Sequence, residues 1–500
     1  KTAYEVRLSL VGSEMCIRDR GLMTRWRACL LICLVWAGIY LPALGSLELK
    51  GEEGRRILPG LAMIRTGDWV VPTVAGEPYL RKPPLINWAV AGSVLGFGRI
   101  DEWTVRAPAV MATLAGALLL FGGVARRQGV ATGLVVAIFH LTGIGLMEKG
   151  RLIEIESIYV ACAAGAFGFW LGWCAPRIEP ATPRRAEVWA GWVLTGLCLG
   201  LGLLAKGPVH LLFFYGPVFA VLAASQRLRD LLHPAHFAGL AVMTGIFAAW
   251  AVPYFAATSE LGTGGVWAAQ FTGRLSGTGF RPGSWLINFP RGLVNFLPWL
   301  VFFPWAVAKG GGRELRALAW ACAVCWFVVM LVPESAPRYS FPVLPALMFV
   351  LGRAGLERLG EPGRRVWGRL VFARGAPGVP ALALRSGVMM ALITVAYALF
   401  AVPRMRVRGE DRPVGAAITA SVPEGERLVA LGLGFRPFEF YVARPIVHAR
   451  RIADLPVDAR FLLCEGTRVA AVRASARWAG AIERLRIRGG DGRVWIVLER

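Results

Sequence analysis

The stretch RRAEVWAGWVLTGLCLGLGLLAKGP, residues 184–208, decides the fold class of this chain. Two arginines precede an apolar run of about twenty residues, and Lys206-Gly207-Pro208 ends it. Such a run predicts a helix that crosses a lipid bilayer, where the backbone must satisfy its own hydrogen bonds. The arginines at the start of the run also indicate its direction, because cytoplasmic loops are enriched in basic residues.

Similar apolar runs recur over most of the 500 residues. With 56% hydrophobic residues and a mean hydropathy of +0.53, the chain carries more apolar surface than a soluble protein of this length needs. We therefore predict an all-α polytopic membrane protein with about eleven to thirteen spans. Besides residues 187–205, the predicted crossings are 28–46, 105–124, 129–147, 153–174, 208–224, 237–256, 290–308, 315–332, 339–352 and 386–403.

Basic residues alternate between loops as the positive-inside rule requires. Placing Arg25 and Arg27 in the cytoplasm makes every second loop basic, up to the arginine-rich segment 353–385. An odd number of crossings then leaves the C-terminus outside, and the expected location is the bacterial inner membrane. The formal charge of +24 follows from these loops and from contact with anionic lipid headgroups, so no nucleic acid partner is expected.

The two ends of the chain differ from its membrane part. Residues 1–22 resemble translated adapter sequence, so we expect a non-native leader there and a natural start at Met23. Residues 23–404 form the predicted transmembrane domain. Strand-like pieces predict a small extracytoplasmic α/β domain over residues 405–500.

Two features of the first outer loop are predicted not to cross the membrane. Residues 48–68 alternate charged and apolar positions at helical spacing, which predicts an amphipathic helix on the outer surface. The apolar patch 85–97 is too short to span comfortably, and we interpret it as interfacial or re-entrant.

The nine cysteines show no metal or disulfide pattern. Cys322 and Cys325 form a CxxC inside an apolar run, where packing is the favoured interpretation over redox chemistry. Cys464 is alone in the C-terminal region, so no disulfide is expected there.

Acidic residues gather on the side opposite the basic loops. Glu52 and Glu53 follow the first crossing, where a carboxylate can act as a general base or can simply belong to a solvated face. Glu154 and Glu156 precede a hydrophobic helix. Being two residues apart, they should not share a helical face, so we expect one to pair with Arg151 and the other to face a site. An interfacial belt of salt bridges is an equal alternative.

Cations also lie on this positive-poor side, at Lys206, Arg81-Lys82, Arg274 and Arg338. Lys206 could snorkel to water or hold a phosphate, although the glycine-rich run before it is not a Walker A loop. An anionic ligand would explain the whole set, because Lys and Arg are the natural phosphate binders. Outward carboxylates and cations together indicate chemistry on a membrane-borne phosphate.

Several short motifs then carry a family resemblance. The chain resembles the GT-C membrane glycosyltransferases that use polyprenyl-phosphate sugars, namely the protein O-mannosyltransferases (glycosyltransferase family 39) and the lipid A aminoarabinose transferases. The resemblance covers roughly residues 28–355. The motifs that carry it are EEGR (52–55), TGDWVVP (66–72), GEPYLRKPPL (76–85), AKGP (205–208) and SAPRYSFPVLP (335–345).

The resemblance implies roles for particular residues. The family's catalytic carboxylate, usually Asp, falls on Glu52, and a second family acid falls on Glu156. Tyr79, Lys82, Arg274 and Tyr339 would contact the donor phosphate, with Lys206 as a further contact. The complete predicted site has Glu52 and Glu156 as catalytic residues and the following as substrate-binding residues: Glu53, Arg55, Tyr79, Lys82, Lys206, Arg274, Arg338 and Tyr339.

The implied reaction is transfer of a sugar from polyprenyl phosphate to an acceptor hydroxyl on the outer face, with inversion at the anomeric carbon. The expected partners are the polyprenyl-phosphate sugar, a lipid, glycan or protein acceptor, and membrane lipids. A divalent cation is possible near the carboxylates, but no ligand spacing demands one. The rivals are a transporter or flippase, which should carry ionisable residues near mid-membrane, and a structural assembly subunit.

Overall fold

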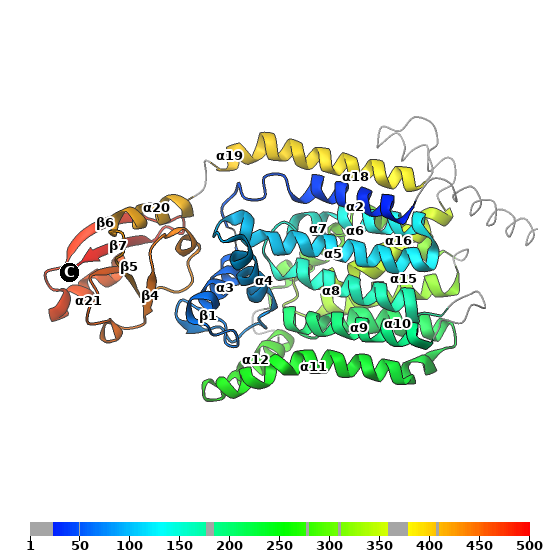
Figure 1. Cartoon of the computed structure of the whole chain (residues 1–500), viewed down its shortest axis with the longest axis horizontal. Coiled ribbons are helices and arrows are strands. Elements are labelled where there is room, and N and C mark those ends of the chain that lie inside the picture. The colour runs from blue at the N-terminus through cyan, green and yellow to red at the C-terminus, as the bar shows by residue number, and fades with distance from the viewer. Residues whose placement is uncertain are drawn as a thin grey trace, which may run out of the picture.

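A computed structural model describes residues 24–49, 51–176, 185–276, 280–308, 312–358, 379–406 and 410–500. The predicted leader, residues 1–22, lies outside these ranges. The described chain forms a bundle of roughly parallel helices with a small mixed sheet beyond one end of it (Figure 1). Both parts of the predicted fold class, the polytopic helical part and the C-terminal α/β region, are confirmed.

Seven helices of the described chain are long and apolar enough to cross a membrane. An α-helix rises about 1.5 Å per residue, so about twenty residues match the hydrocarbon core. Several of these spans are composite, because a short π- or 3₁₀-helix continues the α-helix. The spans are α5 (Glu102–Gln128), α8 (Ile155–Phe169) with η2 (Trp170–Cys174), α9 (Arg185–Lys206), α11 (Pro234–Ala257), α15 (Arg313–Leu331), η6 (Pro337–Val343) with α16 (Leu344–Arg358), and α18 (Val379–Ala396) with η7 (Tyr397–Ala401) and α19 (Val402–Arg406).

The other four predicted crossings are also helical but do not reach a full span one by one. α2 (Arg25–Tyr40), α6 (Val130–Thr142) and α10 (Val209–Ala224) are 16, 13 and 16 residues long. The fourth is α13 (Pro282–Val294) followed by η5 (Trp299–Phe302) and α14 (Phe303–Val307), and it bends by 81°. Seven of the predicted crossings, or eight with the bent pair, are therefore long and apolar enough to span on their own in the described chain. The others break or end early, which a run of apolar residues does not reveal.

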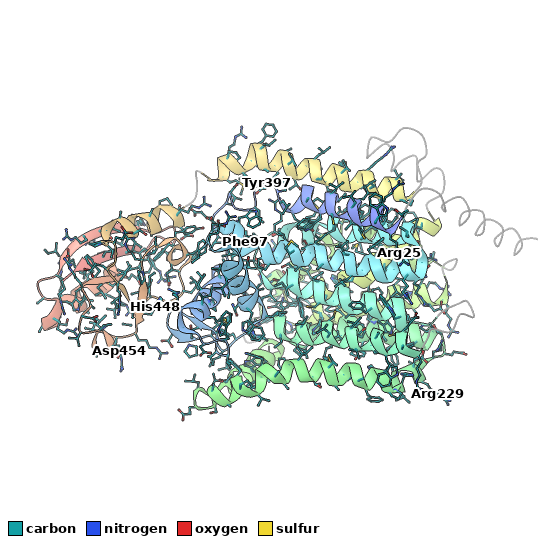
Figure 2. The ribbon with its side chains drawn as sticks, viewed as in Figure 1. Arg25, Phe97, Arg229, Tyr397, His448 and Asp454 are labelled. Carbon is teal, nitrogen blue, oxygen red and sulfur yellow. The ribbon has the colours of Figure 1, made fainter. Side chains whose placement is uncertain are left out.

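The two ends of the bundle differ in character. Figure 2 places Arg25 and Arg229 at one end, while the C-terminal region, marked by His448 and Asp454, lies beyond the other. Arg229 belongs to η3 (Leu228–Leu232) at the first end. At the second end lies α12 (Thr263–Ser276), which η4 (Ser259–Leu261) precedes in the chain (Figure 1). The short helix α7 (Ile144–Lys149) follows α6. The basic loops and the loops that carry the predicted site residues thus lie at opposite ends of the bundle.

A small platform lies between the bundle and the C-terminal sheet (Figure 1). Its helix α3 (Gly54–Thr66) falls within the amphipathic segment predicted at 48–68, and α4 (Leu85–Phe97) coincides with the predicted interfacial patch. A two-stranded hairpin, β1 (Thr73–Val74) and β2 (Glu77–Pro78), joins them. Apolar side chains of α3, α4, α5 and α8 bury one common cluster, so the platform is fixed to the bundle.

The C-terminal region is an α/β sandwich. Its sheet has the order β4-β3-β5-β7-β6, with β3 parallel to β4 and β5 and with β7 antiparallel to its neighbours. Both faces of the sheet are apolar and covered. Its elements are α20 (Asp411–Ser421), β3 (Leu428–Leu431), η8 (Pro437–Tyr441), β4 (Ile446–Ala449), η9 (Ile452–Asp454), β5 (Phe461–Glu465), η10 (Gly466–Arg468), α21 (Val469–Arg473), η11 (Ala476–Trp478), β6 (Ile482–Arg488) and β7 (Val494–Glu499).

The cysteines of the described chain are free thiols. Cys322 and Cys325 are buried within α15 and contact neighbouring helices, and Cys464 is buried in β5. These positions agree with the packing role predicted for them.

Glu48 of the first outer loop fastens the C-terminal region to the platform. Its carboxylate accepts hydrogen bonds from three successive backbone N–H groups, those of Glu410, Asp411 and Arg412, at 3.0 Å each. These N–H groups open α20, whose first turn has no partners within the helix. The Arg412 guanidinium also donates to Glu102 at 2.7 Å and to the backbone of the same loop.

This junction predicts a dependence of stability on pH. Burial and the nearby carboxylates of Glu48, Asp491 and Glu410 raise the pKa of Asp411 to about 6. Because the folded chain holds this proton more tightly than the unfolded chain, the contribution of Asp411 to the free energy of unfolding is highest below the ordinary pKa near 4. That contribution falls as the pH rises through 6. Asp411→Asn should abolish this loss and stabilise the chain at pH 7 by about 1 kcal/mol, a figure that allows for solvent screening at this half-exposed site.

Thermal unfolding of the detergent-solubilised chain between pH 4 and pH 8 measures the effect. Asp458→Asn is the matched control, because Asp458 is exposed in the same region. An Asp411→Asn variant that follows the wild-type pH curve would contradict the prediction.

Candidate active site

A polar cavity of about 200 Å³ lies where the platform meets the ends of α8 and α9. Eight of the ten predicted site residues line it, although they come from five separate stretches of the sequence. They are Glu52, Arg55, Tyr79, Lys82, Glu156, Lys206, Arg338 and Tyr339. The remaining lining residues are Arg56, Arg81, Glu154 and Ile155.

Glu52 lies in the turn before α3 and is about one third exposed. Its two carboxylate oxygens are held by different arginines of the first helical turns. Oε1 lies 3.1 Å from Arg55 Nη1, and Oε2 lies 3.2 Å from Arg56 Nη2. These i,i+3 and i,i+4 pairs fold the carboxylate back along α3, so its direction is set by the start of that helix.

Arg56 is a cavity residue that the sequence predictions missed. Its side chain is almost fully buried, and Nη1 donates to the Tyr79 hydroxyl at 3.0 Å while Nη2 contacts Glu52. Arg56 therefore links the predicted catalytic carboxylate to a predicted phosphate ligand. The amphipathic pattern of residues 48–68 would have found it, since a buried arginine on the inner face of a surface helix needs partners.

Glu156 lies in the first turn of α8 and is also nearly fully buried. Lys206, the last residue of α9, approaches it to 2.6 Å, and Arg338 Nε lies 3.6 Å away. The Lys206 ammonium is also 5.7 Å from the ring centroid of Tyr159 and 5.0 Å from that of Tyr339. Two cations and two aromatic faces thus surround this corner of the cavity.

The structure corrects two expectations about Glu154. It lines the same cavity as Glu156, because it caps α8 in an extended conformation and does not follow helical spacing. Its partner is Lys149 at 3.3 Å, whereas Arg151 donates to the backbone carbonyls of Ile39 and Pro42. The predicted pairing with Arg151 is wrong because that guanidinium satisfies the end of the first helix.

Burial shifts the titration of this Glu154–Lys149 pair. Burial raises the pKa of Glu154, and the neighbouring Glu156 adds to the rise, although Lys149 opposes it. Burial alone would lower the pKa of Lys149, but the carboxylates of Glu154 and Glu148 outweigh it and raise that pKa.

Two predicted residues are not part of the described cavity. Glu53 is fully buried beneath it, where Arg106 makes two contacts of 2.8 Å with the carboxylate and the Ile153 N–H donates to it at 3.1 Å. This geometry gives Glu53 a structural part in holding the loop, and the substrate-binding role predicted for it stays a prediction. The side chain of Arg274, in α12, lies outside the described part of the chain.

The lining carries three carboxylates, Glu52, Glu154 and Glu156, and six cations. The cavity is therefore positive overall, and an anion is the ligand that would balance it. The described residues contain no group of three or more His, Cys, Asp or Glu side chains that could hold a metal ion. Each lining carboxylate has a Lys or Arg partner in contact, so all three are ion-paired.

Two further cavities adjoin this one. A largely apolar cavity of about 710 Å³ shares Glu154 with it and reaches to α18. Another of about 360 Å³ shares Arg338 and extends along α13. The polar cavity therefore shares lining residues with two cavities that reach α18 and α13.

Comparisons with known proteins agree with this picture. Residues 58–260 match the family described as dolichyl-phosphate-mannose-protein mannosyltransferase. The undecaprenyl phosphate-alpha-4-amino-4-deoxy-L-arabinose arabinosyl transferase of Edwardsiella ictaluri is 26% identical over 359 residues, which cover 69% of this chain and 62% of that protein. The enzyme of the same name from Pseudomonas aeruginosa (strain LESB58) is 28% identical over 353 residues, which cover 67% of this chain and 61% of that protein. The matches thus span about three fifths of these relatives' own length.

The fold is shared more widely than the sequence. The crystal structure of ArnT from Cupriavidus metallidurans bound to undecaprenyl phosphate superposes with a TM-score of 0.74 at 15% identity, covering 94% of this chain and 97% of that one. Its apo structure gives a TM-score of 0.73 at 17% identity. The resemblance to GT-C membrane glycosyltransferases is confirmed by these findings together, and the chain is an integral membrane protein of that fold.

Proposed function

We propose that this chain is a membrane glycosyltransferase that moves a sugar from a polyprenyl phosphate to an acceptor hydroxyl on the extracytoplasmic face. The observation that carries the proposal is the cavity in which Glu52 and Glu156 lie among six cations at one end of the bundle. The relatives named above support it, because their names describe transfer of a sugar from undecaprenyl phosphate.

In the proposed reaction the acceptor oxygen bonds to the anomeric carbon while the bond from that carbon to the phosphate oxygen breaks. The electron pair leaves with the phosphate, and the hydroxyl proton passes to the Glu52 carboxylate. The cations Lys82, Lys206 and Arg338 stabilise the negative charge that develops on the leaving phosphate. Because the nearly buried Arg56 directs the carboxylate, it is held ready without reorganisation.

Glu156 has a different part in this scheme. It is nearly fully buried and lies within 2.6 Å of Lys206, so it fixes the ammonium at the inner end of the cavity. A lysine held by a buried carboxylate and two aromatic rings presents its remaining hydrogens in one direction. We infer that Glu156 acts by orienting the phosphate-binding lysine.

The proposed location is the bacterial inner membrane, with the N-terminus in the cytoplasm and with the cavity and the C-terminal region outside. The alternation of basic loops supports this orientation. In the same scheme residues 23–404 form the transmembrane domain and residues 405–500 the extracytoplasmic one. A donor on a polyprenyl carrier fits a site on this side, where no nucleotide sugar is required.

A flippase or transporter for the same lipid is the competing function. It would place ionisable residues near mid-membrane, whereas the cavity residues come from outer loops and helix ends, such as the first turn of α8 and the last residue of α9. This distribution of ionisable residues favours a transferase over a transporter.

Reconstitution of the purified chain in proteoliposomes tests the proposal. A polyprenyl-phosphate sugar with a radiolabelled sugar should pass its label to an extracted envelope acceptor and leave polyprenyl phosphate behind, and a nucleotide sugar should not. Movement of the labelled lipid between leaflets with no transfer would establish the transporter and overturn the enzyme.

A further inference from the structure

The C-terminal region reaches the wall of the cavity through one aromatic side chain, Phe435. The Arg55 guanidinium carbon lies 5.4 Å from the centroid of the Phe435 ring. The same ring rests on the backbone of Gly54, where an added Cβ would come within 2.6 Å of it. Phe435 therefore touches two consecutive residues between Glu52 and Arg56.

Arg55 needs such support to keep one position. Its side chain is 44% exposed, and in the described chain it forms an ion pair with the carboxylate of Glu52, three residues away and also partly exposed. Exposed pairs of this kind are weak, because two long side chains must lose rotamer freedom to form them. An aromatic face over the guanidinium removes part of that freedom and adds cation–π attraction.

The segment that carries Phe435 is itself held against the platform. The Tyr441 hydroxyl accepts a hydrogen bond from the Leu49 N–H at 2.9 Å, and Phe440 packs on the apolar cluster of α3 and α4. At the hairpin of β1 and β2, His448 lies against Gly76, and Arg450 pairs with Glu77. The C-terminal region thus contacts both stretches of the first outer loop that carry cavity residues.

We propose that Phe435 is a positioning residue of the active site, which holds Arg55 in place to bind the donor phosphate and thereby makes the C-terminal region a fixed wall of the cavity. This inference rests on the proposed function, because it assigns Arg55 a ligand that the function supplies. It gives residues 405–500 a part in donor binding.

The kinetic test is Phe435→Leu in the full-length chain. The KM for the polyprenyl-phosphate sugar should rise about fivefold with kcat nearly unchanged, because the lost interaction serves binding before and during the reaction alike. Phe435→Trp should restore the wild-type KM. Phe461→Leu, which removes a buried aromatic ring from β5 in the core of the same region, should leave the KM unchanged. A fall in kcat alone, or equal damage in all three variants, would overturn the proposal.

A second measurement does not depend on catalysis. Hydrogen exchange of the backbone amides of residues 51–57 should accelerate in Phe435→Leu and stay at the wild-type rate in Phe435→Trp. Unchanged exchange in both variants would overturn the positioning role even if transfer is slow. If exchange responds as expected but no polyprenyl-phosphate sugar is ever consumed by the wild type, the proposed function fails while the bracing of Arg55 by Phe435 stands.

Discussion

Glu52→Gln is expected to lower kcat about a thousandfold while the chain still folds and binds polyprenyl phosphate. Glutamine has the size of glutamate but cannot take the proton of the acceptor hydroxyl, and the loss of a general base costs about two to four orders of magnitude. Arg55 and Arg56 would keep hydrogen-bond acceptors at the amide oxygen only, so a modest change in donor KM is also expected.

The assay is single-turnover sugar transfer at saturating donor, with donor binding measured separately by native mass spectrometry. Glu260→Gln is the matched control, because Glu260 lies in η4 next to α12, is exposed and lines none of the three cavities described above. Glu52→Asp should retain part of the activity, since the charge remains and only the reach is shorter. Transfer by Glu52→Gln at the wild-type rate would remove this residue from the mechanism.

Arg106→Met is expected to destabilise the chain by about 3–5 kcal/mol, because it leaves the Glu53 carboxylate buried without its counter-ion. The pair is one of the most deeply buried in the described chain, with side-chain exposures of 3% and 0%. The same guanidinium donates to the carbonyls of Leu44, Leu47 and Glu48, so the first outer loop would also lose three of its anchors.

Thermal unfolding in detergent measures this loss. Arg99→Met is the control, since the Arg99–Asp101 pair is exposed and should contribute less than about 1 kcal/mol. The double variant Arg106→Met with Glu53→Leu should recover much of the stability, because a buried pair can be replaced by apolar side chains at little cost. Equal stability of Arg106→Met and Arg99→Met would show that the pair is not needed to hold the loop.

The membrane fold could be predicted from the sequence because its cause is local. An apolar run long enough to span the bilayer must become a helix wherever it is packed, and each of the eleven predicted crossings falls on a helix. The sequence did not show where a predicted crossing is broken, because such a break depends on neighbouring helices. The bend of 81° between α13 and α14 is one such break, and the stop between α6 and α7 at Gly143 is another.

The charged residues of the site could be predicted because an ionisable side chain at the edge of a membrane costs free energy unless it is paired or functional. Carboxylates and cations that remain on the positive-poor side need a reason, and eight of the ten residues chosen on that ground and by family resemblance line one cavity. Their catalytic and binding roles remain predictions. Glu53 shows the limit of such reasoning, since it is adjacent to Glu52 in sequence and equally acidic, yet it is buried under Arg106.

The sequence by itself determined that this chain crosses a membrane many times and which of its loops carry the charged groups, because both follow from the transfer of side chains between water and lipid. Only the tertiary structure decided which acids face the cavity and that Arg56 joins it. It also decided that Glu154 pairs with Lys149 and that Phe435 of the C-terminal region packs on Arg55. These outcomes depend on the direction in which each helix begins and on contacts between residues tens to hundreds of positions apart. A charged side chain that would stay solvated in water becomes buried and ion-paired at such contacts.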